Sequence, residues 1–433
     1  MLKAGVELYP FQKIGHTFIK QRKWCLIADS MGLGKSIQAI SVFEKGKQVL
    51  VVCPAMLKTN WCEEVKKFTN LSVRAVDSKF DYTSIPDVIV SSYENVKNIP
   101  VDVLPNTIVL DESHFIKNMK AKRTQKIHEY ITATKPEYLV ALSGTPITKS
   151  CIEFYSILKI LSMCPSATNG IPLSLKSQYA FNMHFSHQNT RRINVNGRHG
   201  RRSVQVQEFK GIRNKEELKS ILRGKYLRRL ASKVLDLPKL TEKELIISNK
   251  KTKRDSYLFE MLMSEQGEDD EHFIRLKIEA AVEKVPSTLK YVESIVESGE
   301  SVVVFTDHLD SASTLMSGLN EMKIPVGEVS GNRRSIERDN SIADFTNKKI
   351  KVLVCTFSAA SVGLTLTVAR NMVINDLSYR CDMILQAKKR IHRLSQSRPC
   401  LITTIINGEF DLRIKKKLDE KMKDINEIVS KDL

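Results

Sequence analysis

The stretch Asp29-Ser-Met-Gly-Leu-Gly-Lys-Ser36 decides how the first part of this chain folds. It follows the apolar run 24–28, which predicts a buried strand, and it precedes residues 37–40, which predict the start of a helix. A glycine loop between a strand and a helix is typical of a phosphate-binding loop, because backbone N–H groups and the helix dipole favour an anion there. A chance glycine turn before a helix is the alternative interpretation of this stretch alone.

The side chains of this stretch predict separate contacts with a nucleotide. Lys35 would reach the β- and γ-phosphates, and the Ser36 hydroxyl would bind Mg²⁺. We place Asp29, Gly32 and Gly34 in the same phosphate-binding loop. Asp29 stands where the general G-x-x-x-x-G-K-S pattern has glycine, so that pattern is only partly met.

A second motif supplies acidic side chains. The apolar run 107–110 predicts a strand, and Asp111-Glu-Ser-His114 follows it directly. A carboxylate at the carboxyl end of a core strand can hold Mg²⁺, and the next one can polarise the attacking water. We therefore assign Asp111 to the metal and Glu112 to the water. A solvated acidic turn is the alternative, but the phosphate loop and the carboxylates together favour one nucleotide site.

A third motif lies near the C-terminus, where residues 386–393 read Gln-Ala-Lys-Lys-Arg-Ile-His-Arg. Spacings of four and three residues would place Gln386, Arg390 and Arg393 on one face of a helix. Arginines on one face can stabilise the charge on a transferring phosphoryl group. The spacing alone, however, favours a basic and solvated helix.

The composition restricts the class of protein. The 433 residues suggest two or three domains, and 42% hydrophobic residues are enough for real cores. The formal net charge of +19 indicates a polyanionic partner, either nucleic acid or an anionic membrane. No apolar run approaches the roughly 18 residues of a membrane span, and no basic amphipathic helix with an aromatic face stands out. The eight cysteines form no C-x-x-C pair, which indicates reduced thiols rather than a zinc site or a disulfide framework.

Short apolar runs alternate with helical patterns in two blocks. Near-continuous apolar strands between helices are typical of parallel sheets covered on both faces. The sequence therefore predicts an α/β fold with two lobes, the first with the phosphate loop and the second with the arginine motif, and we expect a nucleotide to bind between them. The predicted strands are 24–28, 49–53, 88–92, 108–110 and 139–142 in the first lobe, and 302–305, 352–355, 372–374 and 401–405 in the second.

The polar sequence between the two blocks, about residues 165–300, predicts insertions and a linker. Its pattern favours long helices over residues 215–230 and 251–284. Residues 192–195 and 203–207 alternate apolar and polar side chains on either side of an Asn196-Gly turn, which predicts a β-hairpin.

The predicted hairpin is basic. Its tip would carry Arg198, Arg201 and Arg202, with Arg191 and Arg192 at its base. Such a hairpin could grip phosphates or wedge open a duplex, so we name Arg192, Arg198, Arg201 and Arg202 as candidate DNA contacts. A solvated, mobile loop is the alternative.

The order of these motifs resembles the Swi/Snf branch of the superfamily-two helicases and translocases, over most of the chain outside 165–210 and 245–285. Residues 29–36 resemble the family's D-E-M-G-L-G-K-T, and residues 111–114 resemble its DExH box. Residues 386–396 resemble Q-A-x-x-R-x-x-R-x-G-Q. Further resemblances lie at 8–12 for the adenine-reading motif, 51–55 with Trp61 for a block along the DNA, 142–146 for the coupling motif, 304–308 for the fourth motif, 355–369 for the fifth, and 214–238 for the joining region.

The resemblance also implies roles for single residues. Gln12 would contact the adenine base, and Arg390 and Arg393 would be arginine fingers. Ser143 and Thr145 would couple the state of the nucleotide to the grip on DNA. Gln386 would act with the arginines as a catalytic residue, and Gly363 with the coupling residues.

The fold implied by the resemblance has two RecA-like lobes. Residues 1–165 would form the ATP-binding lobe and residues 286–433 the helicase C-terminal lobe. Residues 166–285 would hold the insertion, with its basic hairpin and joining helices.

The implied activity is that of a DNA-dependent ATPase, with ATP and Mg²⁺ as cofactors, that remodels forked or branched DNA in replication, repair or recombination. The chain looks closest to the compact annealing and fork-remodelling members. A DExH-type RNA helicase and a non-catalytic nucleic-acid-binding scaffold are the alternatives.

The expected partner is DNA, held through its phosphates and therefore with weak sequence specificity, and not a membrane. Protein partners are not identified by the sequence. Compactness suits a bacterial or viral factor in the cytoplasm, associated with DNA, and a eukaryotic source would imply the nucleus.

Overall fold

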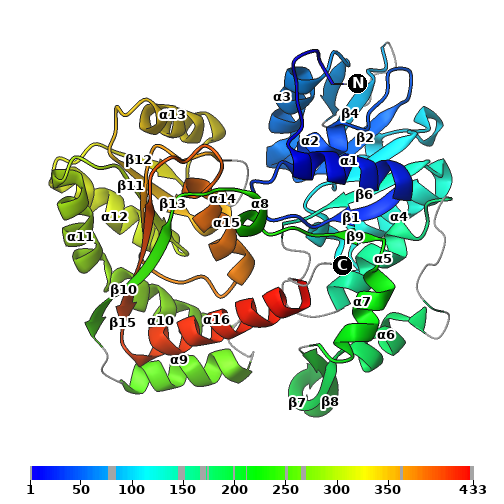
Figure 1. The fold of residues 1–433 in the computed structure, drawn as a ribbon. Coiled ribbons are helices and arrows are strands. Elements are labelled where there is room, and N and C mark those ends of the chain that lie inside the picture. The colour runs from blue at the N-terminus through cyan, green and yellow to red at the C-terminus, as the bar shows by residue number, and fades with distance from the viewer. Residues whose placement is uncertain are drawn as a thin grey trace. The chain divides into compact units, whose positions relative to one another are not determined.

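The computed structural model describes residues 2–76, 84–144, 152–165, 172, 175–197, 200–210, 212–248, 252–264, 270–360 and 364–429. The chain divides into two compact units, and Figure 1 labels most of their helices and strands. Unit 1 comprises Met1–Val234 with Ile425–Leu433, and unit 2 comprises Leu235–Asp424. Each unit has its own parallel sheet, so the predicted α/β fold with two parallel-sheet lobes is confirmed.

The helices and strands that end before residue 235 lie in unit 1. They are α1 (Pro10–Arg22), β1 (Trp24–Ile27), α2 (Lys35–Ile40), β2 (Val49–Cys53), η1 (Ala55–Leu57), α3 (Lys58–Phe68), β3 (Val73–Val76), β4 (Val88–Ser92), η2 (Val96–Asn98), η3 (Val101–Val103), β5 (Thr107–Leu110), η4 (Ser113–Ile116), α4 (Lys122–Thr134), β6 (Tyr138–Leu142), α5 (Ile152–Leu161), α6 (Gln178–Phe185), β7 (His187–Gly197), β8 (Gly200–Lys210), α7 (Lys215–Leu222), β9 (Tyr226–Leu227) and α8 (Ala231–Val234).

The remaining elements begin in unit 2. They are β10 (Leu240–Ser248), α9 (Lys253–Ser264), α10 (Glu271–Val282), α11 (Val285–Glu297), β11 (Val302–Thr306), α12 (Leu309–Glu321), β12 (Val326–Val329), α13 (Ser335–Thr346), β13 (Val352–Thr356), α14 (Phe357–Ala360), β14 (Asn371–Ile374), α15 (Cys381–Ile391), β15 (Cys400–Asn407) and α16 (Glu409–Val429).

The sheet of unit 1 has the strand order β3-β4-β2-β5-β6-β1-β9, and all neighbours run parallel. The central strands β1, β2, β4 and β5 are buried along their whole length. Strands covered on both faces are apolar throughout, because every side chain reaches a core. The five strands predicted for the first lobe are confirmed, and β3 and β9 extend the sheet at its edges.

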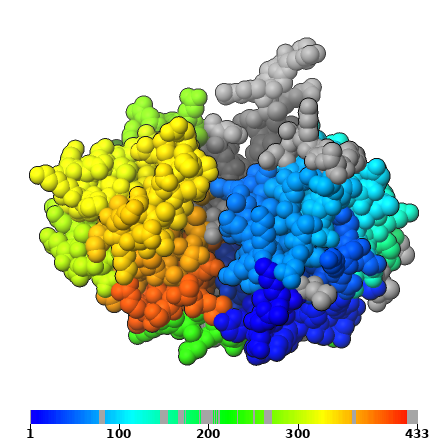
Figure 2. Space-filling model, turned by 90° about the horizontal axis from the view of Figure 1, so that it is seen from above, coloured from blue at the N-terminus to red at the C-terminus, as the bar shows by residue number. Residues whose placement is uncertain are grey.

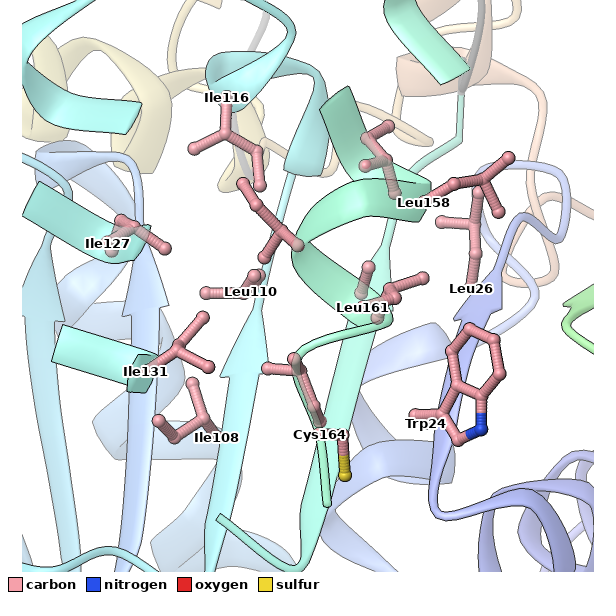
Figure 3. Packing of buried hydrophobic residues seen from close by; sticks show 14 of the residues in the cluster. Trp24, Leu26, Ile108, Leu110, Ile116, Ile127, Ile131, Leu158, Leu161 and Cys164 are labelled. Atoms are coloured by element: carbon pink, nitrogen blue, oxygen red, sulfur yellow. The ribbon is translucent and has the colours of Figure 1, made fainter. Parts of the chain in front are cut away.

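One face of this sheet packs against α4 and α5. Leu26 of β1 and Leu110 of β5 lie in one buried cluster with Ile131 of α4 and Leu158 of α5 (Figure 3). Each such fully buried aliphatic side chain contributes about 1.5–3 kcal/mol to stability. This core holds β1 and β5 in place, and with them the segments that follow their carboxyl ends.

The outer side of α1 lies on the surface of unit 1, where Figure 2 shows the N-terminal residues in dark blue. Ile14 is 56% exposed on this side. Phe11, Gln12 and Ile19 are buried on the opposite side of the helix. The helix thus turns Gln12 toward the interior of unit 1.

The sheet of unit 2 has the order β10-β15-β14-β11-β13-β12 and is also parallel throughout. The four strands predicted for the second lobe are confirmed as β11, β13, β14 and β15. β10 and β12 complete the two edges. Among the described residues, no helix is both long and apolar enough to cross a membrane.

The prediction of a long helix over residues 215–230 is wrong beyond Leu222, where α7 ends. Gly224 has a φ of +74°, a conformation that suits glycine and ends a helix. Residues Tyr226–Leu227 then form β9, which pairs with Leu26–Ile27 of β1. The second predicted helix, over 251–284, is present as two helices, α9 and α10.

The predicted hairpin is present as the antiparallel pair β7–β8, but its register differs from the prediction. Asn196 pairs with Arg201 and Gly197 with Gly200, so Asn196-Gly is part of a strand and not the turn. Arg192 pairs with Gln205 midway along the strand rather than at the base. The ladder is longer than the alternating runs indicate, because backbone pairing continues through polar residues. The tip residue Arg198 lies outside the described residues.

The buried ion pair between Lys284 and Asp411 generates a prediction for the stability of unit 2. Nζ and Oδ2 lie 2.9 Å apart, with side-chain exposures of 2% and 12%. We expect Lys284→Met to lower the free energy of unfolding by about 3–5 kcal/mol, because the carboxylate stays buried without its cation. Urea denaturation followed by circular dichroism measures the loss.

The matched control is Lys349→Met, which breaks the exposed pair of Lys349 with Asp344 in the same unit. Exposed pairs contribute at most about 1 kcal/mol. Equal losses in the two variants would contradict a stabilising role for the buried pair.

Candidate nucleotide-binding site

Three segments meet at the carboxyl edge of the sheet in unit 1. β5, β6 and β1 are neighbours in the sheet and run parallel. The loop after β1 leads to Lys35. Asp111 and Glu112 directly follow β5, and Ser143 directly follows β6. Because parallel strands end at the same edge, the topology brings the phosphate loop and the two carboxylates together.

The phosphate loop is shaped by two close backbone approaches. Gly34 has a φ of +69° directly before α2, and a Cβ there would lie 2.6 Å from Nε2 of Gln12. Gly144 approaches the loop from the end of β6, where a Cβ would lie 2.5 Å from Cγ of Met31. Glycine at position 34 avoids the strain that another residue would have at this φ, and glycine at both positions leaves room for the side chains of Gln12 and Met31.

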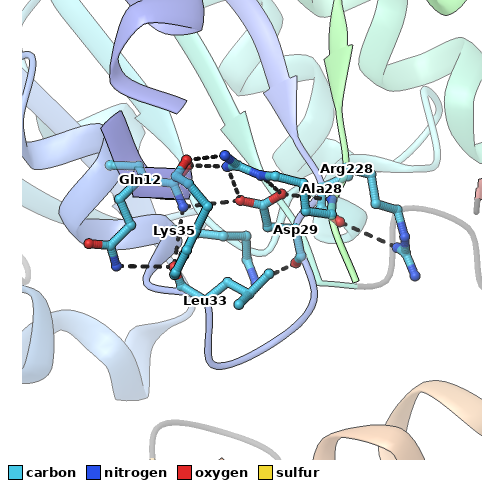
Figure 4. A network of polar contacts seen from close by, with 9 residues as sticks. Gln12, Ala28, Asp29, Leu33, Lys35 and Arg228 are labelled. Atoms are coloured by element: carbon cyan, nitrogen blue, oxygen red, sulfur yellow. Dashed lines mark hydrogen bonds and ion pairs between the residues drawn. The ribbon is translucent and has the colours of Figure 1, made fainter. Parts of the chain in front are cut away.

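The Lys35 ammonium lies among the charges of this edge. Its Nζ donates to the backbone carbonyl of Asp29 at 3.1 Å (Figure 4). Burial lowers the pKa of Lys35, while the carboxylates of Glu112 and Asp111 act in the opposite direction. The two carboxylates are thus near enough to stabilise the positive charge of Lys35.

The Asp111 carboxylate is fixed by two donors. Nε1 of Trp61 donates to Oδ2 at 2.8 Å, and the backbone N–H of Glu112 donates to Oδ1 at 2.9 Å. Burial, and then repulsion from Glu112, raise the pKa of Asp111 to about 7. A divalent cation would relieve this repulsion, and Mg²⁺ prefers oxygen donors of the kind that Asp111 and Ser36 offer.

The side chain of Trp61 binds Asp111, and the prediction that its sequence block lies along DNA stays a prediction. Trp61 is buried, with 1% of its surface exposed, and its ring N–H is committed to Asp111. An indole that is buried needs a partner for its N–H, and the carboxylate supplies one.

Glu112 adopts an uncommon backbone conformation. Its φ of +48° lies in the left-handed region, which costs of the order of 1–3 kcal/mol for a residue other than glycine. The turn is closed by the N–H of Phe115, which donates to the Glu112 carbonyl at 2.9 Å. Oε2 of Glu112 lies 3.2 Å from Nδ1 of His114. Such strain beside a phosphate loop is typical of a functional position.

Gln12 contacts the phosphate loop directly. Its Nε2 donates to the carbonyl of Leu33 at 3.3 Å (Figure 4). Its Oε1 accepts from the N–H of Tyr9 at 3.0 Å. The helix α1 is therefore tied to the loop through this side chain. The predicted contact with adenine stays a prediction.

Asp29 lies at the centre of a polar network and its carboxylate is fully buried (Figure 4). Oδ1 accepts from the backbone N–H and Nε of Arg229 at 2.9 and 3.0 Å, and Oδ2 forms an ion pair with Nη2. Nε2 of Gln38 donates to Oδ2 at 3.1 Å. Nη1 of the adjacent Arg228 lies 3.4 Å from the carbonyl of Ala28.

The sequence did not predict Arg229 and Gln38 as residues of this site. Arg229 lies 200 residues after Asp29, so spacing gives no signal for the pair. A signal was nevertheless present, because a carboxylate directly after a buried strand requires a cation or several donors. Residues 227–229, Leu-Arg-Arg, offer two cations next to an apolar residue.

The second half of the predicted site lies in unit 2. α15 ends at Ile391, so the prediction that Gln386, Arg390 and Arg393 share one helix face is wrong for Arg393. The chain leaves the helix at His392, whose Nε2 lies 2.7 Å from the carbonyl of Pro238.

The two arginines nevertheless converge. Nη1 of Arg390 and Nη1 of Arg393 each donate to the carbonyl of Leu364 at 3.3 Å. Nη1 of Arg393 also donates to Oγ1 of Thr365 at 2.8 Å. Gln386 is buried on α15. The structure thus groups both arginines at the segment that follows β13 and α14.

The remaining predicted residues are placed only in part. Ser143 is buried after β6, and its N–H donates to the carbonyl of Ile27 at 3.1 Å. Thr145 and Gly363 lie outside the described residues. The backbones of Arg192, Arg201 and Arg202 belong to β7 and β8, while their side chains are not described. The coupling and DNA-contact roles stay predictions.

Comparison with known proteins gives matches along nearly the whole chain. Residues 17–292 match the SNF2-related domain, and residues 283–395 match the helicase conserved C-terminal domain. The SWI/SNF-related matrix-associated actin-dependent regulator of chromatin subfamily A-like protein 1 of Drosophila melanogaster is 28% identical over 430 residues, which cover 93% of this chain and 53% of that protein. The DNA annealing helicase and endonuclease ZRANB3 of Bos taurus is 28% identical over 448 residues, which cover 94% of this chain and 39% of that protein.

A solved structure, the Sulfolobus solfataricus SWI2/SNF2 ATPase core in complex with dsDNA, matches with a TM-score of 0.44 and 24% sequence identity, covering 98% of this chain and 93% of that one. The chain spans about half or less of the length of the two curated relatives named above. Because the SNF2-related domain matches more than half of its residues, the chain belongs to the SNF2-related family, and a helicase conserved C-terminal domain follows in its second part.

Proposed function

We propose that this chain is a DNA-dependent ATPase that moves along DNA and remodels forked or branched DNA by branch migration or unwinding. The convergence of Lys35, Asp111 and Glu112 at one sheet edge is the observation that supports it most. These are the groups that bind phosphates, hold a cation and orient water in phosphoryl transfer. The names of the relatives, a chromatin regulator and a DNA annealing helicase, favour DNA over RNA.

The placement of these side chains supports a mechanism for ATP hydrolysis. Lys35 would hold the β- and γ-phosphates, and Gln12 would contact the adenine. Glu112 would accept a hydrogen bond from the water that attacks the γ-phosphorus. The bond from that phosphorus to the bridging oxygen breaks, and ADP leaves with the oxygen. When bound at Asp111 and Ser36, Mg²⁺ supplies positive charge against the phosphate oxygens.

The arginines of unit 2 would complete the site. We assign Arg390 and Arg393 to the phosphates of ATP, reached when the two lobes close on the nucleotide, with Gln386 in the same motif. Ser143, Thr145 and Gly363 would couple this closure to the grip on DNA. The division into an ATP-binding lobe (1–165), an insertion (166–285) and a helicase C-terminal lobe (286–433) stays a prediction.

DNA would be held through its phosphates. The net charge of +19 supports a polyanionic partner, and phosphate contacts give weak sequence specificity and a steep dependence on salt. The basic hairpin β7–β8 would separate strands, with Arg192, Arg198, Arg201 and Arg202 as its contacts. The cellular setting, bacterial or viral cytoplasm or a eukaryotic nucleus, stays a prediction.

The first test is the ATPase activity of the purified chain. We expect duplex or forked DNA to stimulate ATP hydrolysis more strongly than RNA does. Lys35→Ala should abolish the turnover but leave DNA binding intact, because the lysine contacts phosphates of the nucleotide only. The control Lys45→Ala removes an exposed lysine and should behave as the unmodified chain. Stronger stimulation by RNA would favour the RNA helicase, and absence of turnover would favour the scaffold.

The second test concerns the arginine fingers. We expect Arg393→Ala to reduce kcat roughly 10³-fold, as in related phosphoryl-transfer sites. Arg334→Ala is the control, since Arg334 of unit 2 is 79% exposed and pairs with Glu337 on the surface. Full DNA-stimulated hydrolysis by Arg393→Ala would show that the arginine motif is assigned incorrectly.

The third test concerns the hairpin. Deletion of residues 196–202 should weaken strand displacement on forks and four-way junctions but leave DNA-stimulated ATP hydrolysis largely intact, because none of the residues assigned to the nucleotide lies in that segment. Blunt duplexes, with and without ATP, complete the substrate panel. Unchanged strand displacement by the deletion variant would contradict a role in strand separation and favour the alternative of a solvated loop.

A further inference from the structure

Arg229 of the joining region binds the first residue of the phosphate loop, Asp29. Arg229 presents its backbone N–H, Nε and Nη2 to the carboxylate of Asp29, the first residue of the loop. Both residues are almost excluded from solvent, with side-chain exposures of 11% for Arg229 and 0% for Asp29. Charge-assisted hydrogen bonds of this bidentate kind add geometric specificity as well as energy.

The same guanidinium reaches two further elements around the loop. Nη1 donates to the carbonyl of Phe11 in α1, and Nη2 donates to Oε1 of Gln38 in α2 at 2.8 Å. The carbon Cζ lies 5.7 Å from the centre of the Phe11 ring. Every nitrogen of the Arg229 side chain therefore has a protein partner.

The backbone around Arg229 is fixed as well. The N–H of Ala28 donates to the carbonyl of Leu227 at 2.7 Å, and the N–H of Ser30 donates to the carbonyl of Arg229 at 2.9 Å. These bonds continue the parallel pairing of β9 with β1 up to the phosphate loop. The joining segment thus lies beside the loop at the point where Asp29 begins it.

Asp29 links this anchor to the catalytic lysine. Its side chain is bound by Arg229, while its backbone carbonyl accepts the hydrogen bond from Nζ of Lys35 at 3.1 Å. A rotation of Asp29 would move the acceptor of the lysine. The position of the Lys35 ammonium therefore depends on Arg229, which binds the side chain of Asp29.

We propose that Arg229 is a positioning residue for ATP hydrolysis, which sets the conformation of the phosphate loop, and with it the place of Lys35, by fixing Asp29. The proposal deepens the function proposed above and rests on it. It also explains the acidic residue at the start of the loop, since Asp29 serves as the attachment point of the joining region rather than as a phosphate ligand.

The test compares Arg229→Lys and Arg229→Met with the unmodified chain. Lysine keeps the charge but lacks the planar fork, so we expect both variants to reduce kcat/KM for ATP by about 10²-fold, the scale of a small misplacement at a catalytic centre. The KM for ATP should rise, and the KM for DNA should stay unchanged. The control Arg223→Lys alters an exposed arginine of the same segment and should leave every constant unchanged.

Coupling through Asp29 is tested by a double variant. If Arg229 acts by way of the carboxylate, Arg229→Lys should cost little more in an Asp29→Asn background, because the partner is already altered. Additive losses of kcat/KM would overturn the proposal, since Arg229 would then act on the nucleotide by another route.

Amide hydrogen exchange separates this proposal from the proposed function. In Arg229→Lys without nucleotide, exchange should accelerate at residues 30–36 and stay unchanged at Val88–Ser92 of β4, whether or not the chain hydrolyses ATP. Faster exchange throughout the sheet, or unchanged exchange in the loop, would overturn the positioning role. Failure of both variants to fold, judged by circular dichroism, would also overturn it and make Arg229 a purely structural residue.

Discussion

The buried ion pair between Asp29 and Arg229 is the interaction around which the candidate nucleotide site of this chain is built. A carboxylate at the end of a core strand is expensive to bury without partners, and Asp29 has Arg229 and Gln38 around it. The pair joins the phosphate loop, which lies early in the chain, to the joining region, which comes 200 residues later. The joining region then continues into unit 2, where the carbonyl oxygen of Pro238 lies 2.7 Å from Nε2 of His392.

The chemistry at the sheet edge follows from a concentration of charge. Asp111 and Glu112 repel each other, and burial adds to the cost, so the pKa of Asp111 rises to about 7. Trp61 and Lys35 offset part of that cost. In the proposed site, a cation would neutralise the two carboxylates and a phosphate chain would neutralise Lys35, so both would relieve charges that the protein has brought close. The backbone strain at Glu112, which directly follows Asp111, lies at the same edge of the sheet.

The elements and the primary motifs were predictable from the sequence because their signals are local. Apolar runs predicted nine of the thirteen strands in the two parallel sheets, and the residues that follow these runs include Lys35, Asp111 and Glu112. The errors also have local causes. The helical pattern over 215–230 missed Gly224 and the edge pairing of β9, and the spacing of three between Arg390 and Arg393 missed the end of α15 at Ile391.

What the sequence determined by itself was the identity of the reactive groups and the strand or loop from which each projects, since periodicity and glycine placement act over a few residues. Only the tertiary structure decided which distant residues serve them. Trp61 became the partner of Asp111, and Arg229 became the partner of Asp29, although both pairs are separated by at least 50 residues. The physical reason is that a buried polar group selects its partner by position in space, and strand order in a sheet sets that position independently of spacing along the chain.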